Sequence, residues 1–172
     1  MKLFVLVMIL VVAVVVGSPP PTLAQTEWKT FYSPEKKFSI DYVPSESFPL
    51  NITETQDDIE IQTGPLIIRV GIIDSPFYQQ PKMLSMLMEA NAVVQGNTVT
   101  ETTHPITING KEGYSFKDMY TVEDFDGTII DNHIFMGHDG RNYVIDLQYD
   151  ISHTLFANDE IMHTMNSIKF FD

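Results

Sequence analysis

Residues 109–150 decide the fold, and they read NGKEGYSFKDMYTVEDFDGTIIDNHIFMGHDGRNYVIDLQYD. Three dipeptides, Asn109-Gly110, Asp126-Gly127 and Asp139-Gly140, separate segments of similar length in which apolar and polar residues alternate. Asn-Gly and Asp-Gly adopt positive φ at little cost, so between such segments they are a strong signal of hairpin turns. Together with the segment before Asn109, this stretch predicts a four-stranded antiparallel meander.

The length of each turn fixes which residues lie opposite each other, because side chains alternate between the two faces of a strand. A two-residue loop at the third turn pairs Met136 with Tyr143, which joins apolar to apolar. At the second turn a two-residue loop would mix apolar with polar residues, so we expect a three-residue loop over residues 125–127 with a bulge. That loop pairs Phe116 with Met136. The register at the first turn stays open.

Shorter strands are expected ahead of the meander. Residues 28–33 and 38–42 alternate in polarity and flank a turn, which predicts an N-terminal hairpin. Residues 59–63 and 66–74 flank Gly64-Pro65 and predict a second pair. The second of these strands begins with three apolar residues, so we expect it to be covered on both faces.

The polar stretch that ends at Asp58 is expected to be a loop. It contains a glycosylation sequon, Asn51-Ile52-Thr53.

Two helices are expected. Pro81 suits the first position of a helix and Gly96 suits its end, which predicts a helix between them. The closing helix is expected over residues 152–167, with Ser152 as its N-cap. Both should pack on the sheet through apolar residues at helical spacing, with a methionine-rich ligand groove as the alternative for the first helix. The core positions expected are Leu84, Leu87, Met88, Asn91 and Val94 in the first helix, and Leu155, Met162, Met165 and Ile168 in the second.

The first 24 residues are expected to be a signal peptide. Lys2 precedes an apolar run over residues 3–16, which is shorter than the roughly 20 residues of a membrane-spanning helix. Small residues at Thr22 and Ala24 predict cleavage before Gln25, and an uncleaved N-terminal anchor is the alternative. Residues 25–172 are expected to form a single domain in a secreted or extracytoplasmic location.

The composition excludes several classes of function. The chain has a net charge of −13 and no cluster of basic residues, so nucleic acid is not expected as a partner, and membrane contact is expected only through an uncleaved anchor. The chain contains no cysteine, which removes thiol catalysis, Cys-based zinc sites and disulfides. No hydrolase, metalloprotease, nucleotide-binding or dinucleotide-binding motif occurs either.

Two motifs near the ends of the chain carry a resemblance. One is FYSPEKKFSIDYVP at residues 31–44, and the other is Ser167-Ile168-Lys169-Phe170. Their order, with the meander between them, resembles the PsbP-like superfamily over nearly all of residues 28–171. The chain departs from the family pattern at Val43, which intervenes before the proline, and at Phe48, which stands where the family has a tryptophan.

The resemblance implies an α+β fold in which an antiparallel sheet, a meander plus an N-terminal hairpin, is flanked by helices on both faces. It also implies a role as an assembly or binding module, since family members are mostly non-catalytic and some bind divalent ions.

One group of residues suggests a metal site. In the register expected at the third turn, His133 lies opposite Asp146, and Asp131 lies two residues away on the same face. An imidazole and two carboxylates are suitable ligands for zinc or manganese. The alternative is a cross-strand His–Asp pair on a polar sheet face.

The loop that contains Phe77 and Tyr78 suggests a second site. Two adjacent aromatic residues between prolines can form an exposed contact for a protein partner, or can fold down to cover a sheet edge.

Three functions follow from these observations. The first is an exported, non-catalytic binding or assembly module that acts on a protein partner of the cell envelope. The second is a protein that binds a divalent metal or a small ligand, with no other cofactor. The third is a hydrolase, which would need a hydroxyl such as Ser115 or Ser39 next to His133.

Overall fold

The computed structural model describes residues 27–44, 50–73, 80–122 and 127–171. Its largest element is a seven-stranded sheet with strand order β3-β4-β5-β9-β8-β7-β6, in which all neighbouring strands are antiparallel. The strands are β3 (Asn51–Glu54), β4 (Asp58–Thr63), β5 (Leu66–Ile73), β6 (Thr98–Ile108), β7 (Lys111–Val122), β8 (Gly127–His138) and β9 (Arg141–Asp150).

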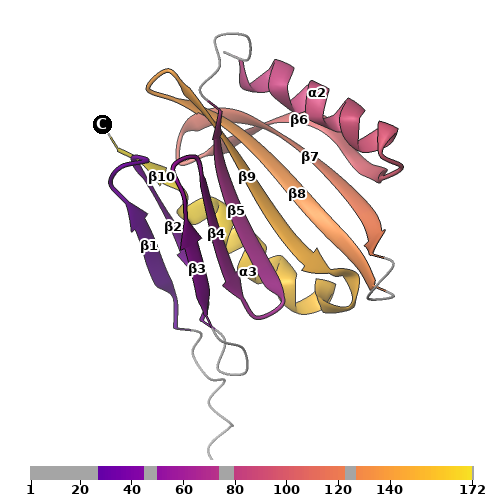
Figure 1. The fold of residues 1–172 in the computed structure, drawn as a ribbon, viewed down its shortest axis with the longest axis horizontal. Helices are drawn as coiled ribbons and strands as arrows, with labels where there is room; N and C mark the ends of the chain where they lie inside the picture. Colours follow the sequence, from indigo (N-terminus) through magenta and orange to yellow (C-terminus); the bar gives the residue numbers. More distant parts are fainter. Residues whose placement is uncertain (1–26, 45–49, 74–79, 123–126, 172) are drawn as a thin grey trace, which may run out of the picture.

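The remaining elements cover the two faces of this sheet (Figure 1). Helix α2 (Pro81–Val94) lies across one face over β6, β7 and β8. The other face is covered by α3 (Thr154–Ser167), which follows a short 3₁₀ turn, η2 (Ile151–His153), and by a small second sheet. That sheet has the order β1-β2-β10, with β1 (Lys29–Ser33), β2 (Phe38–Tyr42) and β10 (Lys169–Phe170). The expected α+β architecture with helices on both faces is confirmed.

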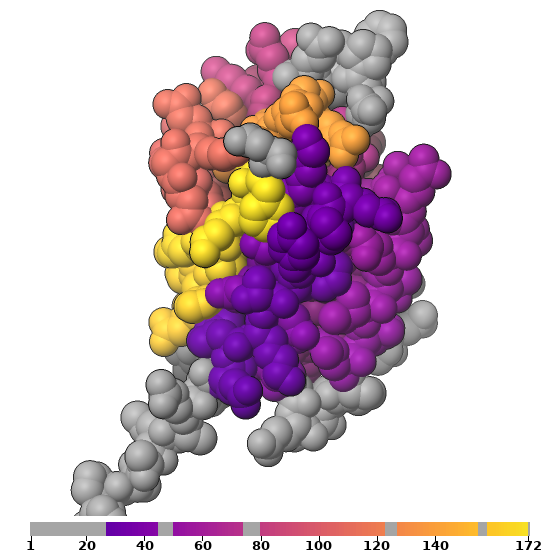
Figure 2. Space-filling model, turned by 90° about the vertical axis from the view of Figure 1, so that its left-hand side faces the viewer, coloured from indigo at the N-terminus to yellow at the C-terminus, as the bar shows by residue number. Residues whose placement is uncertain are grey.

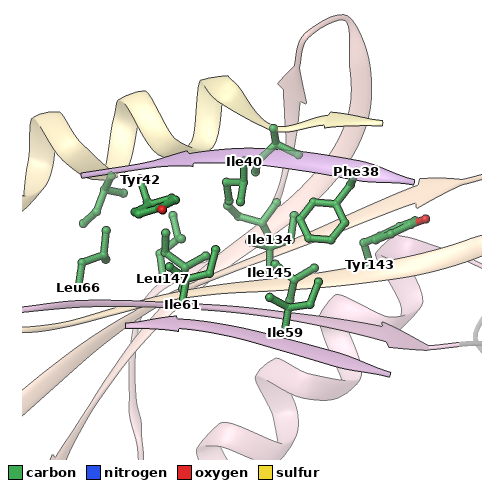
Figure 3. Close-up of a cluster of buried hydrophobic side chains, with 14 of the residues drawn as sticks. Phe38, Ile40, Tyr42, Ile59, Ile61, Leu66, Ile134, Tyr143, Ile145 and Leu147 are labelled. Atoms are coloured by element: carbon green, nitrogen blue, oxygen red, sulfur yellow. The ribbon is translucent and has the colours of Figure 1, made fainter. Parts of the chain in front are cut away.

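The main core lies between the small sheet and the large one (Figure 3). Phe38, Ile40 and Tyr42 point from β2 toward the apolar face of the large sheet, where Ile134 and Ile145 are fully buried. Each such side chain contributes about 1.5–3 kcal/mol by leaving water. Figure 2 shows the same packing from outside, with the N-terminal hairpin in indigo between the C-terminal segment in yellow and the early strands of the large sheet in purple.

The first and third turns of the meander form two-residue loops. Asn109 and Gly110 have φ of 50° and 76°, and Asp139 and Gly140 have φ of 50° and 74°, as a primed hairpin turn requires. The third turn pairs Met136 with Tyr143, so the expected register is confirmed.

The expected register at the second turn is wrong. Val122 pairs with Gly127, and Phe116 pairs with His133 instead of Met136. Four residues, 123–126, therefore connect β7 to β8, and they lie outside the described residues. The expectation failed because it assumed one apolar face. Phe116 belongs to a second buried cluster, on the α2 side of the sheet, whereas Met136 belongs to the main core.

Two expectations about the early strands are also wrong. The stretch around Asn51 is a strand, β3, and not a loop; all four of its residues are exposed, so no apolar alternation marks it. On β5 only the face with Leu66, Ile68 and Val70 is buried, whereas Arg69 on the other face is exposed.

The helices begin and end close to where the sequence predicts, but their buried faces differ. In α2, Leu84, Ser85 and Ala92 are buried, whereas the expected core residues Leu87 and Val94 are 48% and 84% exposed. Small residues face the sheet because the helix lies close to it, with the Ser85 hydroxyl 2.9 Å from that of Thr103 on β6.

In α3 the difference is smaller. Ile161 is buried in place of the expected Met162, which is 55% exposed, and Ile168 is buried as expected. None of the helices within the described residues is long and apolar enough to cross a membrane.

Candidate functional site

The sheet face on the α2 side changes character along its strands. Beneath α2 it is apolar, with Phe116, Phe135 and Val144 packed against Leu84 and Ala92. Two residues further along each central strand the same face becomes charged, because alternation places Asp118, His133 and Asp131 on the side that carries these aromatic rings. The result is a buried polar cluster next to an apolar one.

His133 is the centre of this cluster. Its Nδ1 lies 2.7 Å from Oδ1 of Asp146, the residue opposite it on β9. Its Nε2 lies 3.4 Å from Oδ1 of Asp118 on β7 and 3.8 Å from Oδ2 of Asp131. The ring stacks on Phe116 with centroids 4.2 Å apart. Both ring nitrogens therefore face carboxylates.

Asp131 is held by a chain of polar contacts that leads outward. Its Oδ2 accepts a hydrogen bond of 2.6 Å from Gln148, whose Oε1 accepts one of 2.9 Å from Arg69. Arg69 in turn pairs with Glu60 at 2.8 Å. Although Asp131 is only 3% exposed, its other oxygen, Oδ1, is buried without a hydrogen-bond partner. An unpaired buried carboxylate oxygen is costly.

The structure brings the three predicted residues together but changes their roles. Asp131 and His133 form a group with Asp118 in which one potential ligand atom from each lies within 4.8 Å of the others. Asp146 lies on the opposite nitrogen of the imidazole. The sequence reasoning missed Asp118 because of the wrong register at the second turn; a four-residue connection would have placed it opposite Asp131.

Two opposing effects set the pKa values in the cluster: burial, which disfavours the charged form of each group, and the nearby charges and hydrogen bonds. Burial by itself lowers the pKa of His133, but hydrogen bonds to Asp118 and Asp146 and the charge of Asp131 outweigh it and raise the pKa from 6.5 to about 10. Burial, helped by the charge of Asp146, raises the pKa of Asp131 from 3.8 to about 7. Burial also opposes ionisation of Asp118, but hydrogen bonds from His133 and Asn97 lower its pKa. At neutral pH His133 is thus an imidazolium among carboxylates.

The arrangement does not form a hydrolase triad at His133. Both ring nitrogens face carboxylates, and Ser115 lies on the opposite face of β7, where it lines a cavity beneath α3. Ser39 belongs to β2 in the small sheet.

A second feature is the outer face of α2, by which we mean Met83, Met86, Leu87, Val93 and Val94. Each is between 48% and 84% exposed. Met83, Met86 and Leu87 line a shallow apolar depression of about 410 Å³ together with Gln80 and Lys82. The predicted contact residues Phe77 and Tyr78 belong to residues 74–79, which lie outside the described residues.

Comparisons with known proteins show likeness in fold. No protein-family model matches the chain, and no curated protein matches it significantly in sequence. The solution structure of cyanobacterial PsbP (CyanoP) from Synechocystis sp. PCC 6803 is similar with a TM-score of 0.63 at 11% identity, covering 91% of this chain and 99% of that one. The Ran-binding protein Mog1p of Saccharomyces cerevisiae is similar with a TM-score of 0.56 at 8% identity, covering 86% and 97%.

A protein from Bacteroides thetaiotaomicron VPI-5482 has a TM-score of 0.56 at 13% identity, with 84% of this chain covered. Only 48% of that protein is covered, so the chain spans about half its length. At these identities the likeness shows the fold alone. The chain has the PsbP-like fold, as the two end motifs predict, and no subfamily is assigned.

Proposed function

We propose that the chain is an exported, non-catalytic module of PsbP-like fold that binds a protein partner through the outer face of α2. One observation carries this proposal. Of the ten large apolar side chains that are exposed within the described residues, five lie on this single helix. Contiguous exposed apolar surface typically marks an interaction site, and methionine side chains adapt readily to a partner.

The charge of the chain favours a partner with an apolar contact surface and a basic rim. With a net charge of −13, the chain attracts cationic surfaces over long range. The same charge repels a second copy, so a homodimer through α2 is disfavoured. Lys82 and Glu89 are the charged residues of α2, and they leave its outer face itself nearly neutral.

Two further observations support the proposal. Mog1p, which has a similar fold, is described as a Ran-binding protein, so that fold binds a protein there. The apolar run over residues 3–16 supports export, and the chain, which has no cysteine, is then held by its core rather than by disulfides.

A matched pair of double variants tests the docking surface. The test variant is Met86→Glu with Leu87→Glu, residues that are 54% and 48% exposed on α2. The control is Met162→Glu with Ile151→Glu, residues that are 55% and 47% exposed and belong to α3 and η2, away from α2. Proteins captured from the cell envelope by the wild-type chain should be retained by the control and lost by the test variant.

The captured protein, once purified, should bind the wild-type chain directly and the α2 variant at least about tenfold more weakly, since two half-exposed apolar contacts are lost. Equal binding by both double variants, with melting temperatures close to that of the wild type, would contradict the proposal. A wild-type chain that is dimeric in light scattering, and monomeric as the α2 variant, would instead assign this face to a second copy.

A further inference from the structure

The side chains around Nε2 of His133 leave a position for a positive charge. When a neutral imidazole donates Nδ1–H to Asp146, its Nε2 presents a lone pair. That lone pair faces Asp118 Oδ1 at 3.4 Å and Asp131 Oδ2 at 3.8 Å, both of which are also acceptors. Three acceptors that converge in this way repel one another unless a proton or a metal ion lies between them.

A single proton on Nε2 does not satisfy the cluster. That proton can be donated in a hydrogen bond to Asp118 or to Asp131, and Oδ1 of Asp131 still has no hydrogen-bond partner. Asp131 is only 3% exposed, so water cannot readily compensate. The buried Oδ1 without a partner is an observation separate from the clustering, and it leaves Asp131 with an oxygen that can accept a further contact.

The spacing and the supporting contacts suit a metal ion. Ligands about 2.0–2.1 Å from a tetrahedral zinc ion are about 3.4 Å apart, and Nε2 lies 3.4 and 3.8 Å from the two carboxylate oxygens. The other nitrogen of His133 is oriented by Asp146, in the carboxylate–histidine arrangement found behind many metal-bound imidazoles. Asn97 donates to the remaining oxygen of Asp118 at 2.7 Å.

We propose that Asp118, Asp131 and His133 bind one divalent transition-metal ion, zinc or manganese, with Asp146, Asn97 and Gln148 as positioning residues. Two carboxylates and a neutral imidazole balance the charge of a divalent ion. An imidazole nitrogen in the set favours zinc over calcium and magnesium, which prefer oxygen ligands alone, and the two carboxylates also suit manganese. The site is separate from the docking surface, so either can fail without the other.

Titration of the full chain with each metal alone tests the site. After treatment with EDTA and removal of the chelator, we expect calorimetry with zinc chloride or manganese chloride to show one ion bound per chain. In NMR spectra, Mn²⁺ should broaden the amide signals of residues 118, 131 and 133 before any others. This second measurement needs no variant, so it decides the question even where a substitution prevents folding.

Variants identify the ligands. We expect Asp131→Asn and Asp118→Asn each to weaken metal binding by at least about 100-fold, and Asp146→Asn by about 10–100-fold, the usual loss for a group that orients a ligand. The control is Asp41→Asn, because Asp41 forms a similar pair with His163 at 3.2 Å, and no second carboxylate of the described residues pairs with that nitrogen. Binding should be unchanged in the control.

Three outcomes would overturn the proposal. The first is no binding of either ion at millimolar concentration. The second is broadening by Mn²⁺ that begins elsewhere, for example at His163. The third is a His133 ring whose nitrogens stay protonated in ¹⁵N spectra when zinc is added, which would show that the position holds a proton and not a metal.

Discussion

His133 takes its properties from three neighbouring strands. β8 carries the ring, β9 supplies Asp146, and β7 supplies Asp118 together with the aromatic ring on which His133 stacks. The His133 side chain is 11% exposed, so its charge is balanced by these carboxylates rather than by water. The stability of the metal-free protein should therefore depend on the protonation of this cluster.

We predict that the melting temperature of the full chain in EDTA falls as the pH rises from 5 to 10. Asp131 has its pKa raised from 3.8 to about 7, so the stability it contributes is complete below pH 3.8 and is lost as the pH approaches 7. His133 has its pKa raised from 6.5 to about 10, so its contribution is complete below pH 6.5 and is lost toward pH 10. Calorimetric melting at one-unit steps of pH measures both windows.

Two variants separate these windows. Asp131→Asn should flatten the decline between pH 4 and 7, and His133→Gln should flatten the decline between pH 7 and 10. A wild-type melting temperature that stays constant from pH 7 to 10 would show that His133 is not held as an imidazolium.

At the scale of elements, α2 shows that the ends of a helix can be predicted correctly while its buried face is predicted wrongly. Pro81 and Gly96 mark its ends in the sequence, but apolar size does not mark the side that packs, since Leu84 is buried whereas Leu87 is 48% exposed. Small side chains allow the helix to approach the sheet closely: Ala92 packs in the cluster with Phe116 and Phe135, and the Ser85 hydroxyl lies 2.9 Å from that of Thr103. Five other apolar residues of the helix are turned outward, where they form the proposed docking surface.

The same substitution at two positions of α2 tests this orientation. We predict that Leu84→Ala lowers the free energy of unfolding by about 2–4 kcal/mol, because it leaves a cavity over the sheet. Leu87→Ala should change it by less than about 0.5 kcal/mol, because Leu87 is on the outer face. Urea denaturation measures both values. Equal losses would contradict the buried face described for this helix.

A contact between elements makes a separate prediction. The hydroxyl of the fully buried Tyr143 on β9 donates a hydrogen bond of 2.7 Å to the backbone carbonyl of Lys36, in the turn between β1 and β2. Tyr143→Phe should lower the free energy of unfolding by about 1 kcal/mol, since the ring stays packed while the hydrogen bond is lost. Tyr32→Phe is the control, because Tyr32 is 58% exposed. No difference between the two variants would mean that this bond does not tie the hairpin to the sheet.

The turns explain how far the sequence could predict the candidate site. The third turn was predicted correctly because Met136 and Tyr143 are both in the main core, and matching apolar faces fixed the register. The second turn could not be fixed in this way, because β8 carries apolar residues on both faces: Ile134 and Met136 lie in the main core, whereas Phe135 lies in the second cluster with Phe116 of β7. Asp131, His133 and Asp146 were therefore found, whereas Asp118 depends on a register that only the folded structure defines.

At the scale of the whole molecule, the two faces of the large sheet differ in what covers them. The small sheet and α3 close one face and contain the main core (Figures 1 and 3). The other face is closed by α2 over its apolar part and carries the charged cluster beside the helix. Both proposed sites thus lie on the α2 side of the large sheet. The N-terminal hairpin covers the opposite face.

The proposed export leads to a prediction about the whole chain. We predict that the protein recovered from outside the cytoplasm begins at Gln25, because Thr22 and Ala24 supply the small residues that signal peptidases require. Intact-mass measurement distinguishes this form from the full chain. Replacing Ala24 by Asp should leave the apolar run attached. A native protein that retains Met1 or Lys2 and stays with the membrane would indicate an uncleaved anchor.

Site-specific photo-crosslinking in living cells tests the central proposal, that α2 presents a surface for another protein. p-Benzoylphenylalanine would replace Met86 on α2 in one strain and Met162 on α3 in another, since the two side chains are equally exposed at 54% and 55%. We predict a discrete adduct of higher mass from position 86 and none from position 162. Equal adduct patterns from the two positions, no adduct from position 86, or an adduct of twice the mass of the chain would contradict the proposed partner.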